Sequence, residues 1–406
     1  MEDVLIIGAG LAGLTCARRL QEAGIAPLVV EAADDVGGRV RTDRVEGFLL
    51  DRGFQVLLTA YPEARRWLDY ERLALRPFEP GARVRVDGKF CRVSDPWRRP
   101  QYAWATLRAP VGRLADKLKI LSLRHQVRQG TIGQLWEKPE TSTLAALQRH
   151  GFSPEIIERF FRPFLGGVLL DAELASSSRM FEFVFRMFSA GRVVVPAAGM
   201  QAIPSQLAET LPADRLRLNA PVARINGRDV QLETGEVIQA RRVVVATAGD
   251  AARRLLPALP VVAWRSTTTL YFAAPQSPLG EGILVLNGGE PGPINTLTVM
   301  SDVAPAYSPA GQALISVSVL GRMAVSDDDL TRQVQGQLQA WYGVQVSAWR
   351  LLRIYRVVEA LPARSPTAPA ALAVGAEGVV CGDHRGHGSI QGAMESGRRA
   401  AEFILG

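Results

Sequence analysis

The chain has 406 residues, 47% of them apolar, and its mean hydropathy is +0.06. This length and composition predict an ordinary globular protein that buries a large core in two linked domains. Its three cysteines are too few and too scattered for a disulfide framework or a metal cluster, and they suit a reducing compartment. The formal net charge of +7 raises the question of an anionic partner.

The N-terminus enters an apolar strand pattern directly, without a basic leader or a removable apolar segment. No apolar run reaches about 18 residues, the length that a membrane-spanning helix needs. We therefore expect a cytoplasmic protein without a transmembrane anchor. The sequence gives no indication of the oligomeric state.

The first 22 residues read as a strand, a glycine-rich turn and a helix. Residues 4–7 are wholly apolar, and a helical pattern follows the three glycines. In such a unit the first glycine makes the turn, the second leaves room for a pyrophosphate, and the third lets helix and strand pack closely. The predicted nucleotide contacts of this turn are Gly8, Gly10, Leu11, Ala12 and Gly13.

A second apolar strand, residues 27–30, ends in Glu31 and Ala32, and Glu31 lies 21 residues after Gly10. A carboxylate at that place suits hydrogen bonds from a ribose diol. An ordinary βαβ unit with a glycine-rich turn would leave Glu31 unexplained, so we predict a nucleotide-binding unit. No second GxGxxG motif occurs in the chain, so a separate NAD(P)H domain is not indicated.

The segment Gly37-Gly38-Arg39, followed by Arg41-Thr42, comes a few residues after the acid. With it, the N-terminal region resembles the flavin-containing amine oxidoreductase superfamily, which includes monoamine and polyamine oxidases, protoporphyrinogen oxidases and phytoene desaturases. The resemblance implies bound FAD, with Gly38 and Arg39 at its diphosphate. It also implies that Gly53, Phe54 and Gln55 form a tight turn beside the isoalloxazine ring, although Phe54 stands where Gly or Pro is common.

Further along, the patterns predict a helix over 61–75, a hairpin over 82–93 and mainly helical structure over 97–191. Within the helical part, residues 160–168 and 181–188 are rich in phenylalanine. These residues either wall a pocket for an apolar substrate or simply belong to the core.

Residues 97–128 carry the whole charge excess, with eight basic residues against one acidic residue. Aromatic residues and leucines are interspersed among these cations. The stretch is either the solvated face of a helix or a basic amphipathic surface for peripheral contact with anionic lipid. We do not expect nucleic-acid binding, because no recognition module accompanies the charge.

Residues 193–200 resemble a turn that precedes a helix in the desaturases and protoporphyrinogen oxidases, and residues 216–247 alternate like a small β-meander. In relatives the residue at Val222 holds adenine through its backbone. The strand that ends at Ala248 resembles one that returns to the nucleotide sheet beside the cofactor. Residues 251–355 predict a second sheet with a helix over 327–342. One face of that sheet would lie over the flavin.

The C-terminal part returns to the nucleotide domain. Residues 378–383 predict a strand that ends in Gly382-Asp383, and a helix begins near Ser389. By resemblance, Gly382 and Asp383 would meet the flavin ribityl chain and the diphosphate. The start of the helix would face the pyrimidine edge of the flavin, where its dipole favours negative charge. These helix contacts are Ile390, Gln391, Gly392 and Ala393.

The expected fold is α/β, with a Rossmann-type (GR2-like) FAD-binding domain and an inserted α+β substrate-binding domain. We assign 1–88, 191–250 and 356–406 to the FAD domain, and 89–190 and 251–355 to the substrate domain. His384 and His387 are the only histidines near the ring. They are candidate catalytic bases, or they only fill positions in the cofactor loop.

All four lysines precede the predicted second sheet, where amine oxidases of this superfamily commonly hold a lysine near the flavin. We therefore expect a dehydrogenase or desaturase that acts on a small apolar substrate, isoprenoid-like or polycyclic, with non-covalent FAD and no metal. The alternatives are an oxygen-using flavin amine oxidase and, more remotely, a protein like the Rab GDP-dissociation inhibitors, which bind a prenylated partner without redox activity.

Overall fold

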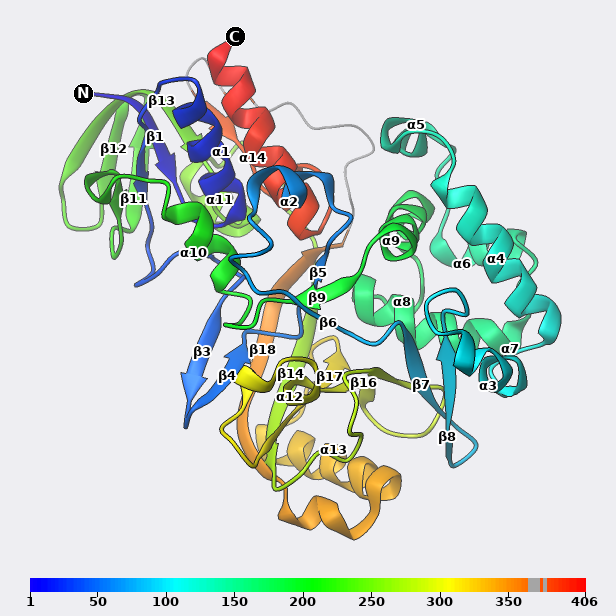
Figure 1. Cartoon of the computed structure of the whole chain (residues 1–406). Helices are drawn as coiled ribbons and strands as arrows, with labels where there is room; N and C mark the ends of the chain where they lie inside the picture. Colours follow the sequence, from blue (N-terminus) through cyan, green and yellow to red (C-terminus); the bar gives the residue numbers. More distant parts are fainter. Residues whose placement is uncertain (364–372, 375–377) are drawn as a thin grey trace.

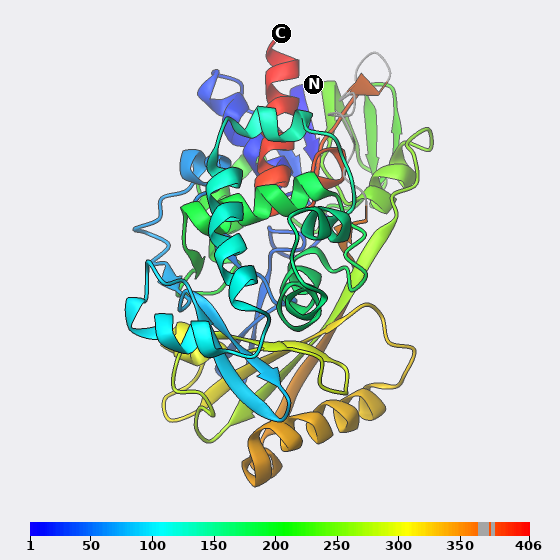
Figure 2. The same ribbon diagram turned by 90° about the vertical axis from the view of Figure 1, so that its right-hand side faces the viewer.

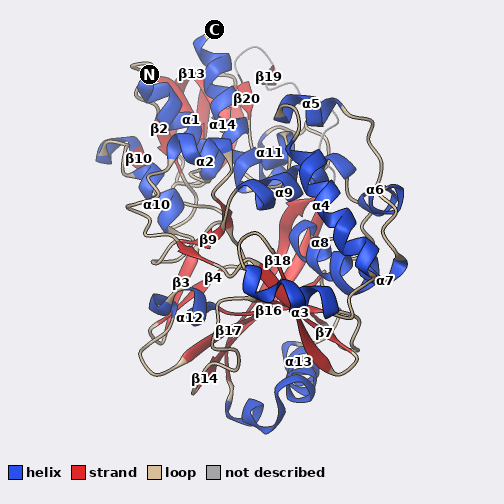
Figure 3. Cartoon of the chain, turned by 45° about the vertical axis from the view of Figure 1, so that its right-hand side comes forward, coloured by secondary structure: helices blue, strands red, loops and turns tan. Residues whose placement is uncertain are grey.

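The computed structural model describes residues 1–363, 373–374 and 378–406. Within these residues the chain forms two large sheets and a group of helices beside them (Figures 1 and 3). Two parts of the predicted third FAD-domain segment (356–406), residues 364–372 and 375–377, lie outside the described residues. No described helix has the length and apolar content to cross a bilayer. The cytoplasmic location stays a prediction.

An eight-stranded sheet forms around the N-terminal strand. Strand β1 pairs in parallel with β2 and β13, and β13 pairs in parallel with β20. Residues 4–7 are buried, because this parallel sheet is covered on both faces. The fold confirms the predicted Rossmann-type unit. The strands are β1 (Glu2–Ile7), β2 (Leu28–Val30), β10 (Leu216–Arg217), β11 (Val222–Asn226), β12 (Asp229–Leu232), β13 (Val237–Val245), β19 (Ala373–Val374) and β20 (Gly378–Val380).

Helices from the two ends of the chain lie side by side against this sheet (Figure 1). They are α1 (Leu11–Glu22) and α14 (Ile390–Leu405). A Cβ atom on Gly397 of α14 would lie 2.0 Å from the carbonyl oxygen of Ala12, so the two backbones are in direct contact. The other helices near this sheet are α2 (Pro62–Trp67), α10 (Ala202–Ala208) and α11 (Gly249–Leu255).

A seven-stranded sheet forms the opposite end of the molecule. Its strands are β7 (Gly81–Val86), β8 (Lys89–Ser94), β14 (Trp264–Ala274), β15 (Leu284–Asn287), β16 (Ile294–Val299), β17 (Ala313–Leu320) and β18 (Arg350–Pro362). Helix α13 (Asp327–Tyr342) packs its leucines and valines on one face of the sheet. The predicted helix and the predicted 82–93 hairpin are confirmed.

Strand pairing refines the predicted domain boundaries. Strands β7 and β8 form one hairpin, so the boundary at residue 88 falls in its turn. Strand β18 pairs with β14 along most of its length, so the boundary at residue 356 falls inside a strand of the second sheet. Strand β7 and the whole of β18 therefore belong to the second sheet. The division into an FAD domain and a substrate domain stays a prediction.

The region over 97–191 is helical, as predicted, and it faces the viewer in Figure 2. Helices α8 and α9 lie innermost, between the two sheets, and α4 packs on the outer side of α9. The helices are α3 (Ala103–Arg108), α4 (Leu114–Arg128), α5 (Ile132–Glu137), α6 (Thr143–Arg149), α7 (Pro154–Ile156), α8 (Arg162–Leu169) and α9 (Ser178–Ala190), with a π-helical turn over Ile157–Phe161.

The predicted helix over 61–75 is wrong in its length, because α2 ends at Trp67 and Leu68 is extended. The Asp69 carboxylate accepts hydrogen bonds from the backbone N–H groups of Glu71 (3.0 Å) and Arg72 (3.1 Å). Such a bond offers the backbone an alternative to helix continuation. A turn therefore replaces the second half of the predicted helix.

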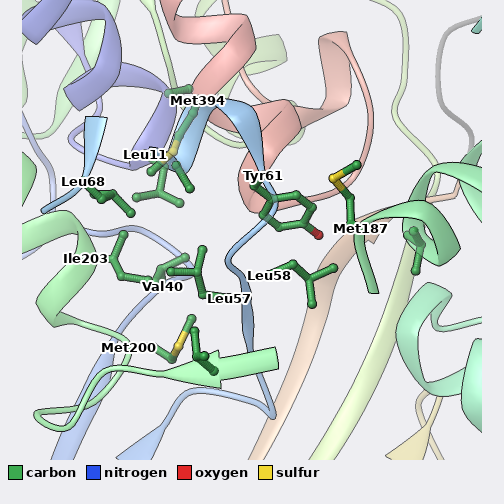
Figure 4. Close-up of a cluster of buried hydrophobic side chains, with 14 of the residues drawn as sticks. Leu11, Val40, Leu57, Leu58, Tyr61, Leu68, Met187, Met200, Ile203 and Met394 are labelled. Carbon is green, nitrogen blue, oxygen red and sulfur yellow. The ribbon is translucent and has the colours of Figure 1, made fainter. Parts of the chain in front are cut away.

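Short strands and buried side chains join the two ends of the molecule. The strands are β3 (Thr42–Val45), β4 (Phe48–Asp51), β5 (Leu57–Leu58), β6 (Arg76–Pro77) and β9 (Val193–Val195), and a short helix, α12 (Met300–Val303), follows β16. Figure 4 shows Leu11, Leu57, Ile203 and Met394 gathered from α1, β5, α10 and α14. This cluster is the floor on which the nucleotide turn and the last helix rest.

Asp51, at the end of β4, connects this floor to the second sheet. Its carboxylate accepts hydrogen bonds from the hydroxyls of Thr42 (2.6 Å) and Tyr307 (2.9 Å) and from the backbone N–H of Met200 (2.9 Å). Its carbonyl oxygen accepts one from the Tyr271 hydroxyl (2.9 Å). Burial raises the pKa of Asp51 to about 6, against the opposing effect of these hydrogen bonds.

We expect Asp51→Asn to change how stability depends on pH. In the wild type the folded state keeps the Asp51 proton up to about pH 6, while the unfolded chain loses it near a pKa of about 3.9. The free energy of unfolding of the wild type, relative to Asp51→Asn, should therefore fall by about 3 kcal/mol from about pH 4 to about pH 6. Urea unfolding across this range tests it. Parallel curves for the two proteins would contradict the assignment.

Candidate functional site

A cavity of about 750 Å³ lies between the two sheets and the helices α8 and α9. Of the twenty predicted cofactor contacts, seventeen line it, so the fold brings both ends of the chain to one place. They are Gly8, Gly10, Leu11, Ala12, Glu31, Ala32, Gly38, Arg39, Gly53, Phe54, Gln55, Val222, Ala248, Gly382, Asp383, Ile390 and Ala393. Their contact with a cofactor stays a prediction.

The other three predicted contacts lie behind the cavity wall. A Cβ at Gly13 would lie 2.0 Å from the carbonyl oxygen of Gly8, and one at Gly392 would lie 2.0 Å from that of His387. The side chain of Gln391 turns away, because its Oε1 accepts a hydrogen bond from the backbone N–H of Glu63 (2.9 Å). These residues hold the wall together without lining it.

The first turn is built for close approach of a ligand. Gly8 has a left-handed φ of 105°, and a Cβ there would lie 2.9 Å from the carbonyl oxygen of Ala246. Gly10 has an extended backbone, and a Cβ there would meet nothing within 4 Å. The missing side chain of Gly10 therefore leaves open space at the N-terminus of α1, where backbone N–H groups and the helix dipole favour an anion.

Glu31 is held by the turn that it faces. Its two carboxylate oxygens accept hydrogen bonds from the backbone N–H groups of Ala9 (2.7 Å) and Ala33 (2.9 Å). Each oxygen keeps a further lone pair, so the carboxylate can also accept hydrogen bonds from hydroxyl groups in the cavity.

Arg39 joins the two halves of the site. Its guanidinium donates to the Asp383 carboxylate (2.5 Å) and to the carbonyl oxygen of Ala360 (2.7 Å), and it lies 5.3 Å from the ring centre of Trp264. The Asp383 side chain is 4% exposed and that of Arg39 is 33% exposed. The Gln55 amide also donates to the Arg39 carbonyl oxygen (2.8 Å). The turn at Gly53 has a left-handed φ of 97°, as predicted.

The N-terminus of α14 points at the cavity. Ser389 caps the helix by accepting a hydrogen bond from the backbone N–H of Gly392 (3.0 Å). Ile390 and Ala393, on the same first turn, line the cavity. Tyr61 lies beside them, hydrogen-bonded to Ser389, and burial raises the pKa of its hydroxyl.

Neither predicted catalytic histidine lines the cavity. The His384 ring lies against the Cα of Gly382. His387 lies between the rings of Trp136 and Phe183, with its Nδ1 3.0 Å from the Ser389 hydroxyl. Burial lowers the pKa of each imidazole to about 4, so both are neutral near pH 7. Their catalytic role stays a prediction, which this placement does not favour.

The far end of the cavity is apolar on its helical side. The phenylalanine-rich segments divide between the two expected roles, because Phe161, Phe181 and Phe183 are core residues while others line the cavity. The lining residues of α8, α9 and the turn between them are Phe164, Gly167, Val168, Leu170, Met180, Val184 and Phe188.

The opposite side of this end is formed by the second sheet. Strands alternate, so the face opposite α13 carries the other set of side chains. On β14, β16 and β17 that set includes the hydroxyls of Thr267, Thr296 and Ser318, which line the cavity. The predicted second sheet thus supplies one wall, and its hydroxyls provide the polar groups of this end.

Sequence reasoning missed these hydroxyls and several charged residues. Glu233 and Arg254 line the end of the cavity beside Gly10, Glu31 and Val222, which we call the nucleotide end. Arg52 lines the middle of the cavity. Their positions follow from strand register and from the α11 turn. Only Glu233 had a signal in the sequence. It comes directly after Leu232, which pairs with Val222, so pairing the two predicted strands would have placed it beside that residue.

A Rossmann-type sheet, a glycine-rich turn facing an open cavity and an adjoining apolar chamber define a dinucleotide-binding protein with a second, apolar site. A family model described as "Flavin containing amine oxidoreductase" matches residues 11–405, and the chain belongs to this family of flavin-dependent enzymes.

Curated relatives and solved structures agree with this family. "Coproporphyrinogen III oxidase" of Propionibacterium freudenreichii subsp. freudenreichii is 25% identical over 427 residues, covering 85% of this chain and 80% of that protein. "15-cis-phytoene desaturase" of Synechococcus elongatus is 34% identical over 97 residues, but the match spans only 21% of this chain and 20% of that protein.

Two solved structures share the fold along the whole chain. A putative protoporphyrinogen oxidase from Exiguobacterium sp. 255-15 has a TM-score of 0.74 and 17% identity, covering 99% of this chain and 98% of that one. A putrescine oxidase bound to putrescine has a TM-score of 0.73 and 18% identity, covering 100% of this chain and 99% of that one.

Three glycine substitutions test the cavity. Gly10→Ala points a methyl group into open space, so it should cost about 1 kcal/mol of stability at most while lowering flavin retention on purification. Gly13→Ala meets a backbone oxygen and should cost about 3 kcal/mol, the upper end for overpacking. Gly336→Ala, in α13 with open surroundings, is the control and should stabilise by about 0.5–1 kcal/mol. Full flavin retention in Gly10→Ala would contradict the assignment.

The Arg39–Asp383 pair makes a second prediction. Arg39→Met should destabilise the flavin-free protein by about 3 kcal/mol, because it leaves the buried Asp383 carboxylate without its cation. Adding Asp383→Asn should recover part of that loss. Urea unfolding of the single and double variants measures both effects. Arg332→Met, at an exposed pair with Asp329, is the control and should cost less than about 1 kcal/mol. Equal losses at the two sites would contradict a structural role for the pair.

Proposed function

We propose that the protein is an FAD-dependent dehydrogenase or desaturase that takes a hydride from an apolar substrate, isoprenoid-like or polycyclic. One observation carries this proposal. The cavity-lining residues of α8, α9 and the second sheet include no residue that is charged at neutral pH. A substrate that fits between apolar side chains and three hydroxyls is neutral and largely hydrocarbon.

The residues of the nucleotide end fit FAD. The open space at Gly10 accommodates a diphosphate beside the α1 N-terminus, and Glu31 can accept hydrogen bonds from a ribose. The backbone at Val222 suits adenine. Arg39 and Asp383 would lie near the diphosphate and the ribityl chain. When bound, FAD supplies the hydride acceptor for the reaction.

The positions of the possible attachment groups support non-covalent binding. None of the three cysteines and neither His384 nor His387 lines the cavity. Cys381, directly after β20, is buried and donates its backbone N–H to the carbonyl oxygen of Val245 (3.0 Å), and burial raises the pKa of its thiol to about 12. A protonated, enclosed thiol is a poor nucleophile.

This chain's own residues would orient the substrate and exclude water. Phe164, Val168 and Phe188 cover one side of the substrate, while Thr267 and Ser318 on the other side offer hydrogen bonds to its few polar groups. The N-terminal dipole of α14 favours negative charge at the adjoining part of the cavity.

The amine oxidase alternative has less support. None of the four lysines lines the cavity. Lys117 is buried against the carbonyl oxygens of Leu107 (2.6 Å) and Ala109 (2.8 Å), and Lys138 pairs with Glu182 (2.6 Å). The uncharged chamber also offers no carboxylate to balance the charge of an ammonium substrate.

Substrate reduction of the bound flavin tests the proposal. The purified protein should have a flavin spectrum, and anaerobic addition of phytoene, a neutral hydrocarbon, should bleach it faster than putrescine does. Faster bleaching by putrescine would favour the amine oxidase alternative. A protein that takes up no FAD would favour the prenyl-binding alternative instead.

A pair of tryptophan substitutions ties the activity to the chamber. Val168→Trp fills the apolar end and should lower substrate-driven bleaching at least about tenfold while leaving the flavin spectrum unchanged. Val344→Trp, at a residue that is 81% exposed, is the control and should behave like the wild type. Equal activity of the two variants would contradict the proposed position of the substrate.

A further inference from the structure

Exposed apolar side chains concentrate on one outer face of the helical region. Among the described residues, twelve large apolar side chains are exposed, and five of them lie within residues 97–118. Both of the exposed tryptophans are among these five. We call this set the α3–α4 face, and it consists of Trp97, Trp104, Leu107, Leu114 and Leu118. Apolar side chains clustered in this way mark an interaction surface more often than chance exposure does.

Contacts between the two helices hold this face together. Lys117, the fourth residue of α4, is buried and donates to the carbonyl oxygens of Leu107 and Ala109 at the end of α3. Leu114 and Leu118 lie one helical turn apart on the outer side of α4, while Leu123 and Val127 point into the core. Helices α3 and α4, in cyan, lie on the side of the molecule that faces the viewer in Figure 2.

The cations on this face are not balanced by local carboxylates. Asp116 is the only acidic residue in 97–128, and it is 1% exposed, since it caps α4 and accepts hydrogen bonds from Ser153. Arg98, Arg99 and Arg124 do pair with acids outside the segment. Exposed cations without a carboxylate partner among the described residues remain at Arg108, Arg113 and Arg128.

Guanidinium and indole groups also alternate on this surface. Arg108 lies 4.5 Å from the ring centre of Trp104, and Arg124 lies 4.6 Å from that of Trp97. Tryptophan and arginine side chains of this kind suit the boundary between lipid headgroups and acyl chains, where the ring is half buried and the cation meets phosphate.

We infer that the α3–α4 face docks on the surface of a bilayer that contains anionic lipid. Leucine and tryptophan side chains would enter the headgroup region, and Arg108 and Arg113 would contact lipid phosphates. The face lies one helix away from the cavity, because Arg98 donates to the carbonyl oxygens of Phe188 and Ser189 at the end of α9. Docking would therefore hold the apolar chamber close to the membrane surface. The inference stands whether or not the proposed substrate class is correct.

Vesicle binding by the purified full chain tests this inference. Sedimentation with vesicles of phosphatidylcholine plus phosphatidylglycerol should carry down the wild type, and phosphatidylcholine alone should carry down much less. Arg108→Gln with Arg113→Gln should weaken binding to the anionic vesicles about twenty-five-fold, since each basic side chain contributes roughly fivefold at such a surface. Trp104→Ser with Leu118→Ser should weaken binding to both vesicle types.

A matched control separates this face from general surface effects. Val344→Ser with Arg241→Gln removes one exposed apolar and one exposed basic side chain from other elements, and it should bind like the wild type. Wild-type binding should also fall as salt concentration rises. If the wild type binds neither vesicle type, the inference is overturned, and a protein partner remains for this face. Unchanged binding of both α3–α4 variants would overturn it as well.

Discussion

Two backbones meet without an intervening side chain where α1 crosses α14, and the arrangement of the cavity depends on this contact. Gly397 allows the last helix to touch the carbonyl of Ala12, just as Gly13 allows the first helix to touch the carbonyl of Gly8 in the turn after β1. These approaches bring Asp383 within reach of Arg39, across 344 residues of sequence. Any side chain at Gly397 would separate the helices and with them the two halves of the site.

The nucleotide end was predictable because its determinants are backbone geometry and short spacing. Glycines at 8, 10 and 13, an acid at the end of the second strand and a strand that ends in Gly382-Asp383 each constrain only a few neighbouring residues. The helix over 327–342 was equally predictable, since Ser326 caps it and its apolar residues repeat with the helical period. Such local rules need no knowledge of distant partners.

The apolar end was not predictable, because periodicity tells which side chains are buried but not against what. Phe161 and Phe164 belong to the same apolar stretch of the sequence, yet Phe161 enters the core and Phe164 lines the cavity. The histidines after Asp383 looked accessible to a ligand, whereas Trp136 and Phe183 of the distant helical region enclose His387. The helix over 61–75 was overestimated because the Asp69 side chain stops it with a turn.

This contrast also explains how one fold can carry different chambers. The chain ends form the nucleotide end, whereas α8, α9 and the second sheet supply the chamber, so side chains there can change without disturbing the α1–α14 contact. In this chain those side chains carry no charge, and burying an ammonium ion among them would cost far more than burying a hydrocarbon. Under the proposed function, the chamber therefore disfavours a cationic substrate.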